Sequence, residues 1–455
     1  MDFTDRNVLV VGLARSGLAA AKTLKTLGAN VIANDIKDKY QLGEVYKELD
    51  SIGVEWALGV RPDEYLDRAD LVVISPGISI DSPFVQKAIK MGIEVISEVE
   101  LAYRLCKAPI VAITGTNGKT TTTALVGEIF KAVPRETYVV GNIGIPFASI
   151  ARQTQESHVV VAEVSSFQLE AMPTFHPRVA AVLNITPDHL DRHKTMENYI
   201  NLKAGIFKNS TQSDWVILNA DDPLSASLAK KTKANVLFFS RTQKLSKGAW
   251  VEEGWVVLDI GQGKEKVCQA KDIFIPGPHN LENALAATLI TRVMDVSPKT
   301  IAEVLKVFQG VEHRIELVGT IDGITFYNDS KGTNIDAAKK AIESMTAPTV
   351  LIAGGYDKGS SFEPLIDACG EIVSHIVVLG QTSDKIIKAA KDKGFQNVYK
   401  VGSLEEGVKK AFSLALPDGN VLLSPACASW DMFKDFEERG RVFKEAVRAL
   451  KEEKE

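Results

Sequence analysis

Apolar and polar positions alternate in blocks that predict strands followed by helices. Short apolar runs of three to five residues are separated by longer stretches, several of which carry apolar residues at helical spacing. A strand that is buried on both faces reads as a continuous apolar run, so this alternation predicts a parallel sheet covered by helices. Residues 1–98 are therefore predicted to form a doubly wound, Rossmann-like domain. Its apolar runs lie at residues 8–11, 31–34, 71–75 and 94–96, and its first helix is predicted over residues 16–27.

The same alternation continues along the rest of the chain. A length of 455 residues is enough for about three domains. Residues 99–310 are predicted to form a central α/β domain of the P-loop ATPase type, and residues 311–455 a C-terminal Rossmann-like domain. The predicted strands of the third domain are residues 324–328, 349–352, 376–379, 397–401 and 421–423. The overall prediction is an α/β protein of three domains.

The most specific motif is a glycine-rich turn between an apolar run, residues 109–113, and a helical pattern that starts near Lys119. A strand, a tight turn and a helix N-terminus together direct backbone N–H groups toward a phosphate. Lys119 can reach the terminal phosphates of a nucleoside triphosphate, and the Thr120 hydroxyl can ligate the accompanying Mg²⁺. Ile113 stands where the common form of the motif has glycine, so the loop is a variant. The alternative is a glycine turn that binds nothing. The residues predicted to bind ATP here are Gly115, Thr116, Asn117, Gly118, Lys119, Thr120 and Thr121.

A second glycine turn opens the first domain. Gly12, Ala14 and Gly17 approximate a dinucleotide fingerprint, and Asp35 ends the next predicted strand at the spacing of a ribose-binding carboxylate. Gly77 lies in another turn at the end of a strand, where open parallel sheets bind ligands. These turns predict a nucleotide-containing ligand, although tight turns without a ligand remain an alternative.

Candidate metal ligands follow strands of the central domain. A buried strand ends at Glu163, a position suited to Mg²⁺, although a solvent-facing glutamate is the alternative. His189, Asp191 and His193 could be interpreted as a zinc cluster, but no fourth ligand is evident and the oxygen-rich surroundings favour magnesium. Lys203 lies in a helical pattern, whose periodicity alone favours an exposed lysine.

Further polar residues lie at predicted helix starts and strand ends. Asn280 and Asn283 share the first turn of a helix, so both amides could face one ligand, such as adenine, although Asn280 as a simple N-cap is an equal alternative. In the third domain three strand ends carry polar clusters, which would suit a small anionic substrate or serve as turns and caps. The clusters are residues 328–334, 354–359 and 424–436.

Composition limits the partners. With 45% hydrophobic and 24% charged residues and a net charge of −5, the chain carries no bulk basic field for nucleic acid. No apolar run reaches the ~18 residues that span a bilayer, and the N-terminus does not resemble a signal peptide. The four cysteines are far apart in sequence, which favours reduced thiols. We therefore expect a cytoplasmic protein that binds neither nucleic acid nor membranes.

Taken together, the motifs resemble those of the Mur ligases of peptidoglycan synthesis, and the resemblance extends over the whole chain. The loop alone would fit every Mur ligase and folylpolyglutamate synthase. Two other runs favour the family members that add D-glutamate, and the Asp-Asn-Pro-Arg motif typical of the diaminopimelate- or lysine-adding members is absent from the sequence. The matching segments are Thr-Gly-Thr-Asn-Gly-Lys-Thr-Thr at 114–121, Ser-Ser-Phe-Gln-Leu-Glu at 165–170, Asp-His-Leu-Asp-Arg-His at 188–193, Asn-Asp-Ser-Lys-Gly-Thr-Asn at 328–334 and the segment 424–436, which begins Ser-Pro-Ala-Cys-Ala-Ser.

The resemblance implies ATP-driven amide formation. The carboxylate of UDP-N-acetylmuramoyl-L-alanine would take the γ-phosphoryl group of ATP, and the amine of D-glutamate would attack the resulting acyl phosphate. Two Mg²⁺ ions and a monomeric enzyme are expected. A uridine nucleotide, and not a nicotinamide cofactor, would then occupy the first domain, since an ATP-driven ligation has no role for a hydride carrier.

The resemblance also assigns roles to residues. Lys119, Glu163, His189 and Lys203 would be catalytic. Thr120 and Glu163 would hold one Mg²⁺, and His189 a second together with Lys203 as its carbamate, an assignment that replaces the exposed-lysine interpretation. The remaining ATP contacts would be Asn280, Asn283, Arg314 and Asp329. The UDP-sugar contacts would be Gly12, Ala14, Gly17, Asp35, Ile36, Gly77, Asn142, Ser165 and Gln168. The D-glutamate contacts would be Thr333, Lys358, Ser429 and Phe436.

Three alternatives remain. A non-enzymatic nucleotide switch would not need the polar strand ends of the third domain. A folylpolyglutamate synthase would not need the N-terminal turn with Asp35. Another Mur ligase would share the ATP site but differ in its amino acid. Trp430 follows Ser429 where an aliphatic side chain is expected, which affects the shape of the amino-acid pocket.

Overall fold

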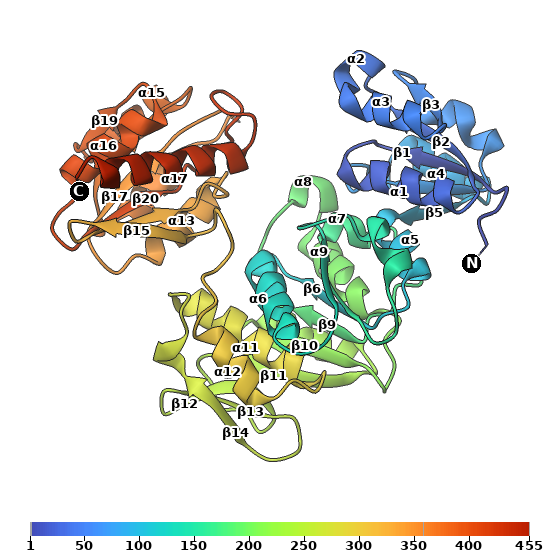
Figure 1. Ribbon diagram of the computed structural model, residues 1–455, viewed down its shortest axis with the longest axis horizontal. Helices are drawn as coiled ribbons and strands as arrows, with labels where there is room; N and C mark the ends of the chain where they lie inside the picture. Colours follow the sequence, from blue (N-terminus) through green and yellow to red (C-terminus); the bar gives the residue numbers. More distant parts are fainter. Residues whose placement is uncertain (1, 358, 455) are drawn as a thin grey trace. The chain divides into compact units, whose positions relative to one another are not determined.

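The computed structural model describes residues 2–357 and 359–454, without the side chain of Asp191. The chain divides into two compact units. The first extends to Phe274 and includes His279–Phe308, and the second comprises Ile275–Pro278 and the chain from Gln309 onward. The first unit contains two sheets and the second unit contains one (Figure 1). The predicted three-domain α/β architecture is confirmed.

The N-terminal sheet is parallel, and helices cover both of its faces. Val8 and Val10 of β1 pack with α1, α3 and α5, whereas Leu9 and Val11 pack with η1 and α4. This burial on both faces explains the continuous apolar runs in the sequence. The strands, in sheet order, are β3 (Glu55–Leu58), β2 (Asn30–Asp35), β1 (Asn7–Val11), β4 (Leu71–Ile74) and β5 (Glu94–Ser97). The helices are α1 (Arg15–Thr26), α2 (Lys39–Leu42), α3 (Glu44–Ser51), η1 (Pro62–Arg68), α4 (Pro83–Lys90) and α5 (Glu98–Leu105).

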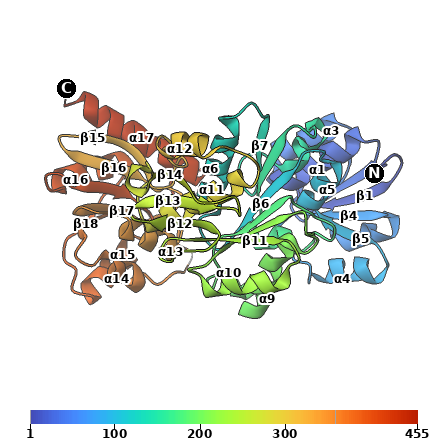
Figure 2. The same cartoon turned by 90° about the horizontal axis from the view of Figure 1, so that it is seen from below.

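The central sheet has nine strands. Their order is β14 (Glu265–Gln269), β13 (Trp255–Asp259), β12 (Gly248–Glu252), β11 (Asn235–Ser240), β10 (Trp215–Asn219), β9 (Val179–Val182), β6 (Ile110–Thr114), β8 (Val159–Glu163) and β7 (Thr137–Gly141). The strands from β7 to β12 are parallel, and β12, β13 and β14 form an antiparallel extension at one edge (Figures 1 and 2). The sequence did not predict this extension.

Helices of the central domain connect the parallel strands. The helical pattern around Lys203 forms α9, which ends at Ala204 and is followed by a 3₁₀ turn, Gly205–Phe207. The helices are α6 (Lys119–Lys131), α7 (Ser166–Leu169), α8 (Leu190–His193), α9 (Met196–Ala204), α10 (Pro223–Ser227), α11 (Pro278–Arg292) and α12 (Pro298–Leu305). Strand β6 lies between β8 and β9, so the segments that follow these three strands emerge at the same edge of the sheet.

The C-terminal sheet has six strands in the order β15 (Glu316–Ile321), β16 (Ile324–Asn328), β20 (Asn420–Leu423), β17 (Thr349–Ala353), β18 (Val373–Val378) and β19 (Val398–Lys400). Only β15 runs antiparallel to its neighbour within this sheet. One face packs against α13 (Ile335–Glu343), α14 (Glu363–Cys369) and α15 (Ser383–Asp392). The other face packs against α16 (Leu404–Leu414) and α17 (Phe436–Glu452).

The four cysteines are free thiols. Within the described residues, no helix combines the length and the apolar character that crossing a bilayer requires.

Candidate active site

The phosphate loop connects β6 to α6. Gly118, directly before the helix, has a φ of 80° in the left-handed region that glycine adopts without strain. A Cβ at this position would lie 2.3 Å from Oδ1 of Asn283. The Thr122 hydroxyl donates to the same Oδ1 at 3.2 Å, and Asn283 Nδ2 donates to Asn280 Oδ1 at 3.1 Å. The two asparagines predicted to contact ATP are therefore packed at the phosphate loop.

The alternative role of Asn280 as a helix N-cap is wrong. Helix α11 begins at Pro278, so Asn280 is its third residue. Both amides are buried. Their place in the first turn follows from the sequence, but their approach to Gly118 could be seen only in the fold.

Asn184 holds the loop in shape, a role that the sequence did not predict. Its Oδ1 accepts a hydrogen bond from Asn117 N at 2.8 Å, and its Nδ2 donates to Asn117 O at 3.2 Å. Its own carbonyl accepts from Thr116 N at 2.9 Å. Asn184 comes shortly after β9, the neighbour of β6, and this position was the one available signal.

Lys119 and Thr120 begin α6. The Lys119 ammonium donates to the carbonyls of Gly115 and Thr116 at 2.8 and 2.9 Å, so the side chain folds back over its own loop. Thr120 is buried in the first helical turn. The loop therefore has the strand, glycine turn and helix start that phosphate binding requires.

Glu163 ends β8 beside the loop and is buried, so the solvent-facing alternative is wrong. Its Oε1 accepts a hydrogen bond from Asn142 Nδ2 at 2.8 Å. Its Oε2 is buried and has no hydrogen-bond partner among the described residues. A buried carboxylate oxygen without a partner is costly, and a divalent cation is the kind of ligand that would satisfy it. The donor chemistry at Glu163 thus fits Mg²⁺.

Lys203 is buried in α9, so the exposed-lysine interpretation is wrong. Its ammonium nitrogen lies 4.6 Å from the ring centroid of Tyr199. Burial, with the nearby positive charge of Lys119, holds the pKa of Lys203 well below its usual range, while Asp188 acts in the opposite direction. Burial also raises the pKa of Tyr199 to about 12. The environment therefore favours the neutral amine of Lys203, the form that reacts with CO₂.

His189 lies on the segment that follows β9 and has a positive φ of 52°. Its side chain is half exposed, and its Nε2 lies 3.5 Å from Asp188 Oδ2. Its ring packs against the Phe167 ring, with the two ring centroids 4.8 Å apart. Across the described residues, no hydrogen bond or ion pair joins His189 to Lys203 or Glu163. The structure therefore leaves the predicted grouping of His189 with Lys203 untested.

His193 is buried, and its Nε2 lies 3.0 Å from the Ser166 hydroxyl. Burial lowers its pKa. The side chain of Asp191, the other member of the alternative zinc cluster, lies outside the described residues. The described side chains contain no group of three or more His, Cys, Asp and Glu residues placed to hold a metal.

The N-terminal turn is built by close backbone packing. Gly12 has a φ of 86°, and a Cβ on Gly17 would lie 1.8 Å from the Gly12 carbonyl oxygen. The Ser75 hydroxyl donates to that carbonyl at 2.5 Å, and Asp35 Oδ2 accepts from Leu13 N at 2.8 Å. Asp35 thus orders the turn.

The other residues predicted for the UDP-sugar follow strands of the N-terminal and central sheets. Ala14 immediately precedes α1, and Ile36 is 78% exposed. Ser165 and Gln168 form a capping box at the start of α7, in which Gln168 Oε1 accepts from Ser165 N at 2.9 Å. Nothing lies within 4 Å of a Cβ at Gly77. The capping box gives Ser165 and Gln168 a structural role in addition to any contact with a ligand.

In the second unit, Asp329 follows β16 and is buried. Ser424 donates a hydrogen bond of 2.7 Å to its Oδ2. Burial raises the pKa of Asp329 to about 7, although Ser424 and the charge of Arg314 oppose this shift. Arg314 and Asp329 are therefore electrostatically coupled within this unit.

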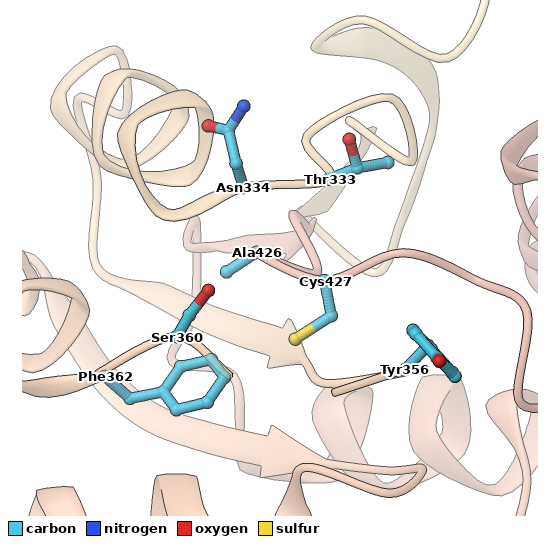
Figure 3. Close-up of a pocket in the computed structure, with 7 residues that line it drawn as sticks. All are labelled: Thr333, Asn334, Tyr356, Ser360, Phe362, Ala426 and Cys427. Carbon is cyan, nitrogen blue, oxygen red and sulfur yellow. The ribbon is translucent and has the colours of Figure 1, made fainter. Parts of the chain in front are cut away.

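A pocket of about 90 Å³ lies among residues that follow β17 and β20 (Figure 3). Of the residues predicted to bind D-glutamate, Thr333 lines it; Lys358 lies outside the described residues. Ser429 is buried, and Phe436 begins α17. The residues that line the pocket are Thr333, Asn334, Tyr356, Ser360, Phe362, Ala426 and Cys427.

Trp430 is 62% exposed, and the centroid of its ring lies 5.5 Å from the ring centroid of Tyr356, which lines the pocket. The unexpected aromatic side chain therefore packs beside the pocket lining.

Comparisons with known proteins cover the whole chain. Residues 6–97 match the MurD-like N-terminal domain of Mur ligases, residues 113–291 the Mur ligase middle domain, and residues 313–427 the Mur ligase glutamate ligase domain. The UDP-N-acetylmuramoylalanine–D-glutamate ligase of Caldanaerobacter subterraneus is 51% identical over 453 residues, which cover 99% of this chain and 100% of the relative. The enzyme of the same name from Clostridioides difficile is 48% identical over 453 residues, which again cover 99% of this chain and 100% of the relative.

Solved structures agree on the fold. The UDP-N-acetylmuramate-alanine ligase MurC from Thermotoga maritima superposes with a TM-score of 0.61 at 20% identity, over 98% of this chain and 100% of that chain. A pseudomurein peptide ligase from Methanothermus fervidus superposes with a TM-score of 0.58 at 20% identity, again over 98% of this chain and 100% of that chain. With matches in all three domains and half of all residues identical to full-length relatives, this chain belongs to the Mur ligases and, within them, to the UDP-N-acetylmuramoylalanine–D-glutamate ligase (MurD) family.

Proposed function

We propose that this chain catalyses the ATP-dependent addition of D-glutamate to UDP-N-acetylmuramoyl-L-alanine in peptidoglycan precursor synthesis. The observation that carries the proposal is the full-length identity of about half to ligases named for this reaction. The glycine turns, the buried carboxylate Glu163 and the polar pocket support it, because each offers chemistry that such a ligation needs.

The reaction proceeds in two chemical steps. A carboxylate oxygen of the alanyl group attacks the γ-phosphorus of ATP, and ADP leaves. The deprotonated amine of D-glutamate then attacks the acyl carbon, phosphate leaves, and an amide forms. Phosphoryl transfer of this kind depends chiefly on positioning and on neutralising charge.

The central domain supplies the ATP site. We assign the phosphates to the backbone of the loop 115–118 and to the ammonium of Lys119, which would exchange its bonds to loop carbonyls for bonds to phosphate. Asn280 and Asn283 support the loop from α11. Arg314 and Asp329 of the second unit complete the proposed set of ATP contacts.

Mg²⁺ fits the donor set at this edge of the sheet. Thr120 and Glu163 would hold one ion, and His189 with Lys203 as a carbamate would hold a second. Bound ions would supply positive charge for the transferring phosphoryl group. Asn142 orients Glu163 through its hydrogen bond, and the buried setting of Lys203 favours the uncharged amine that carbamate formation requires.

The two other substrates are assigned to the outer domains and to residues that follow β7 and β8 of the central domain. The UDP-sugar contacts would be Gly12, Ala14, Gly17, Asp35, Ile36, Gly77, Asn142, Ser165 and Gln168. The D-glutamate contacts would be Thr333, Lys358, Ser429 and Phe436. We further propose that the enzyme acts as a monomer in the cytoplasm, where ATP drives the reaction.

The test is phosphate release from ATP in the presence of UDP-N-acetylmuramoyl-L-alanine and one amino acid at a time. We expect turnover with D-glutamate and background rates with L-glutamate, L-lysine and diaminopimelate. Preference for one of the last two would assign the chain to another Mur ligase reaction. Turnover only with a folate in place of the UDP-sugar would support the folylpolyglutamate synthase alternative.

A further inference from the structure

Arg192 of α8 connects the central domain to the N-terminal sheet through one guanidinium group. On the central side, its Nε and Nη2 donate to Oε1 and Oε2 of Glu170 at 2.9 and 2.7 Å. On the other side, its Nη1 donates to the Pro76 carbonyl and its Nη2 to the Ile78 carbonyl, both at 2.9 Å. One side chain thus bridges segments more than 90 residues apart in sequence.

The bridge is enclosed and well satisfied. The side chains of Arg192 and Glu170 are 15% and 4% exposed. The Phe167 ring covers the guanidinium, with its centroid 4.3 Å from Arg192 Cζ. Glu170 Oε2 also accepts a hydrogen bond from Ile80 N at 3.2 Å. Removing one member of such a buried pair leaves the other charge without compensation. A lysine would keep the charge but could not reproduce the planar fork that reaches all of these acceptors.

Each segment in the bridge carries a residue assigned above to the UDP-sugar or to a metal ion. Gly77 lies between the two carbonyls that Arg192 binds. Gln168 is two residues before Glu170, and His189 is three residues before Arg192. The contacts therefore fix the turn 75–80 of the N-terminal domain against the short helices α7 and α8 of the central domain. All of these segments belong to one compact unit.

We propose that Arg192, oriented by Glu170, is a positioning residue for the UDP-sugar substrate. This inference rests on the proposed function, in which the N-terminal domain binds the nucleotide while the alanyl carboxylate reacts at the phosphate loop. A substrate held at one end reacts at the other only if the two binding regions keep their spacing. A misplacement of about 1 Å at a reacting centre costs on the order of 10²-fold in rate.

The kinetic test compares Arg192→Ala, Arg192→Lys and Glu170→Gln with the matched control Arg68→Ala. Arg68 also forms a two-bond pair, with Glu55, but on the exposed surface of the N-terminal domain. We expect kcat/KM for UDP-N-acetylmuramoyl-L-alanine to fall by about 10²-fold in Arg192→Ala and by about tenfold in the other two, with KM for ATP within about twofold. Arg68→Ala should match the wild type.

Hydrogen exchange provides a readout that does not depend on activity. Exchange of the backbone amides of residues 77–80 should accelerate in Arg192→Ala and Glu170→Gln and stay unchanged in Arg68→Ala. If Arg192→Ala does not fold, the two conservative variants carry the test, because each keeps most of the side chain's volume.

The outcomes separate the two proposals. An active wild type with unchanged kcat/KM in the folded variants would overturn the positioning role alone. An equal loss of affinity for ATP would also overturn it, because the defect would then be general. A wild type without ligase activity would refute the proposed function and, with it, the substrate role of Arg192.

Discussion

Asn142 and Glu163 are joined by a 2.8 Å hydrogen bond from the amide Nδ2 to the carboxylate Oε1, while Glu163 Oε2 is buried without a hydrogen-bond partner in the described part of the chain. Two strand ends thus orient one carboxylate and leave one of its oxygens available beside the phosphate loop. This arrangement is the physical basis for placing Mg²⁺ at Glu163.

Glu163→Gln tests that placement. The amide keeps the shape and one acceptor but removes the negative charge, so Mg²⁺ with a non-hydrolysable ATP analogue should raise Tm less than in the wild type. Turnover should fall by about 10²-fold or more. Thermal melts with and without Mg²⁺ make the measurement, and Glu156→Gln, at an exposed position of the same domain, is the control. An undiminished Mg²⁺-dependent shift in Glu163→Gln would exclude Glu163 as a ligand.

Lys203→Ala tests the carbamate. The variant should fold but lose a metal ligand, with turnover lowered by about 10²-fold. Added formate should restore part of the activity, because a small carboxylate can enter the space that the side chain leaves. In the wild type, bicarbonate with heavy carbon should produce a carbamate resonance by NMR that Lys203→Ala lacks. Near-wild-type turnover in Lys203→Ala without any added carboxylate would contradict the assignment.

Glu98→Gln tests a pH dependence at the N-terminus of α5. Glu98 is fully buried and accepts a 2.5 Å hydrogen bond from Ala148 N, and burial raises its pKa to about 7. The folded state therefore holds the proton more tightly than the unfolded state, and this group's contribution to stability decreases as pH rises from about 4.5 through about 7. Relative to the wild type, Glu98→Gln should gain up to roughly 3 kcal/mol between pH 5 and pH 8.

Melting curves at both pH values provide the measurement for Glu98→Gln. The exposed Glu64→Gln in the same domain is the control and should show a pH-independent difference from the wild type. A Glu98→Gln difference that is equal at both pH values would show that Glu98 ionises normally.

Gly17→Ala tests the construction of the N-terminal turn. The added Cβ would lie 1.8 Å from the backbone oxygen of Gly12, so α1 must move away from the sheet. We expect a loss of roughly 2 kcal/mol or more in stability, within the range that overpacking produces. Gly205→Ala is the control, since its Cβ would meet nothing within 4 Å. Equal Tm values for the two variants would contradict the close packing.

The sequence predicted the elements whose signals are local. Strand β8 ends at Glu163 and strand β16 at Asn328, as the apolar runs predicted. The antiparallel β12–β13 hairpin was missed although it had a signal. Its strands are joined by Glu253-Gly254, both at positive φ, which is typical of a two-residue hairpin turn.

Contacts between distant segments could not be predicted in the same way. The position of Asn184 shortly after a strand does not by itself indicate that it will bind Asn117, 67 residues earlier, because that contact exists only once β9 lies beside β6. Periodicity favoured exposure for Lys203, whereas tertiary packing buries it against Tyr199. The sequence around Arg192 predicts an ordinary surface charge, because its contacts with the N-terminal turn exist only in the folded protein.

The most direct test of the proposed reaction follows one oxygen atom. UDP-N-acetylmuramoyl-L-alanine labelled with heavy oxygen in its alanyl carboxylate is incubated with the enzyme, ATP and D-glutamate, and the phosphate and the nucleotide product are analysed by mass spectrometry. The account predicts one heavy oxygen in the released phosphate and a D-glutamyl residue on the product, because the carboxylate oxygen that attacks ATP leaves with phosphate. Unlabelled phosphate, or a product without glutamate, would contradict it.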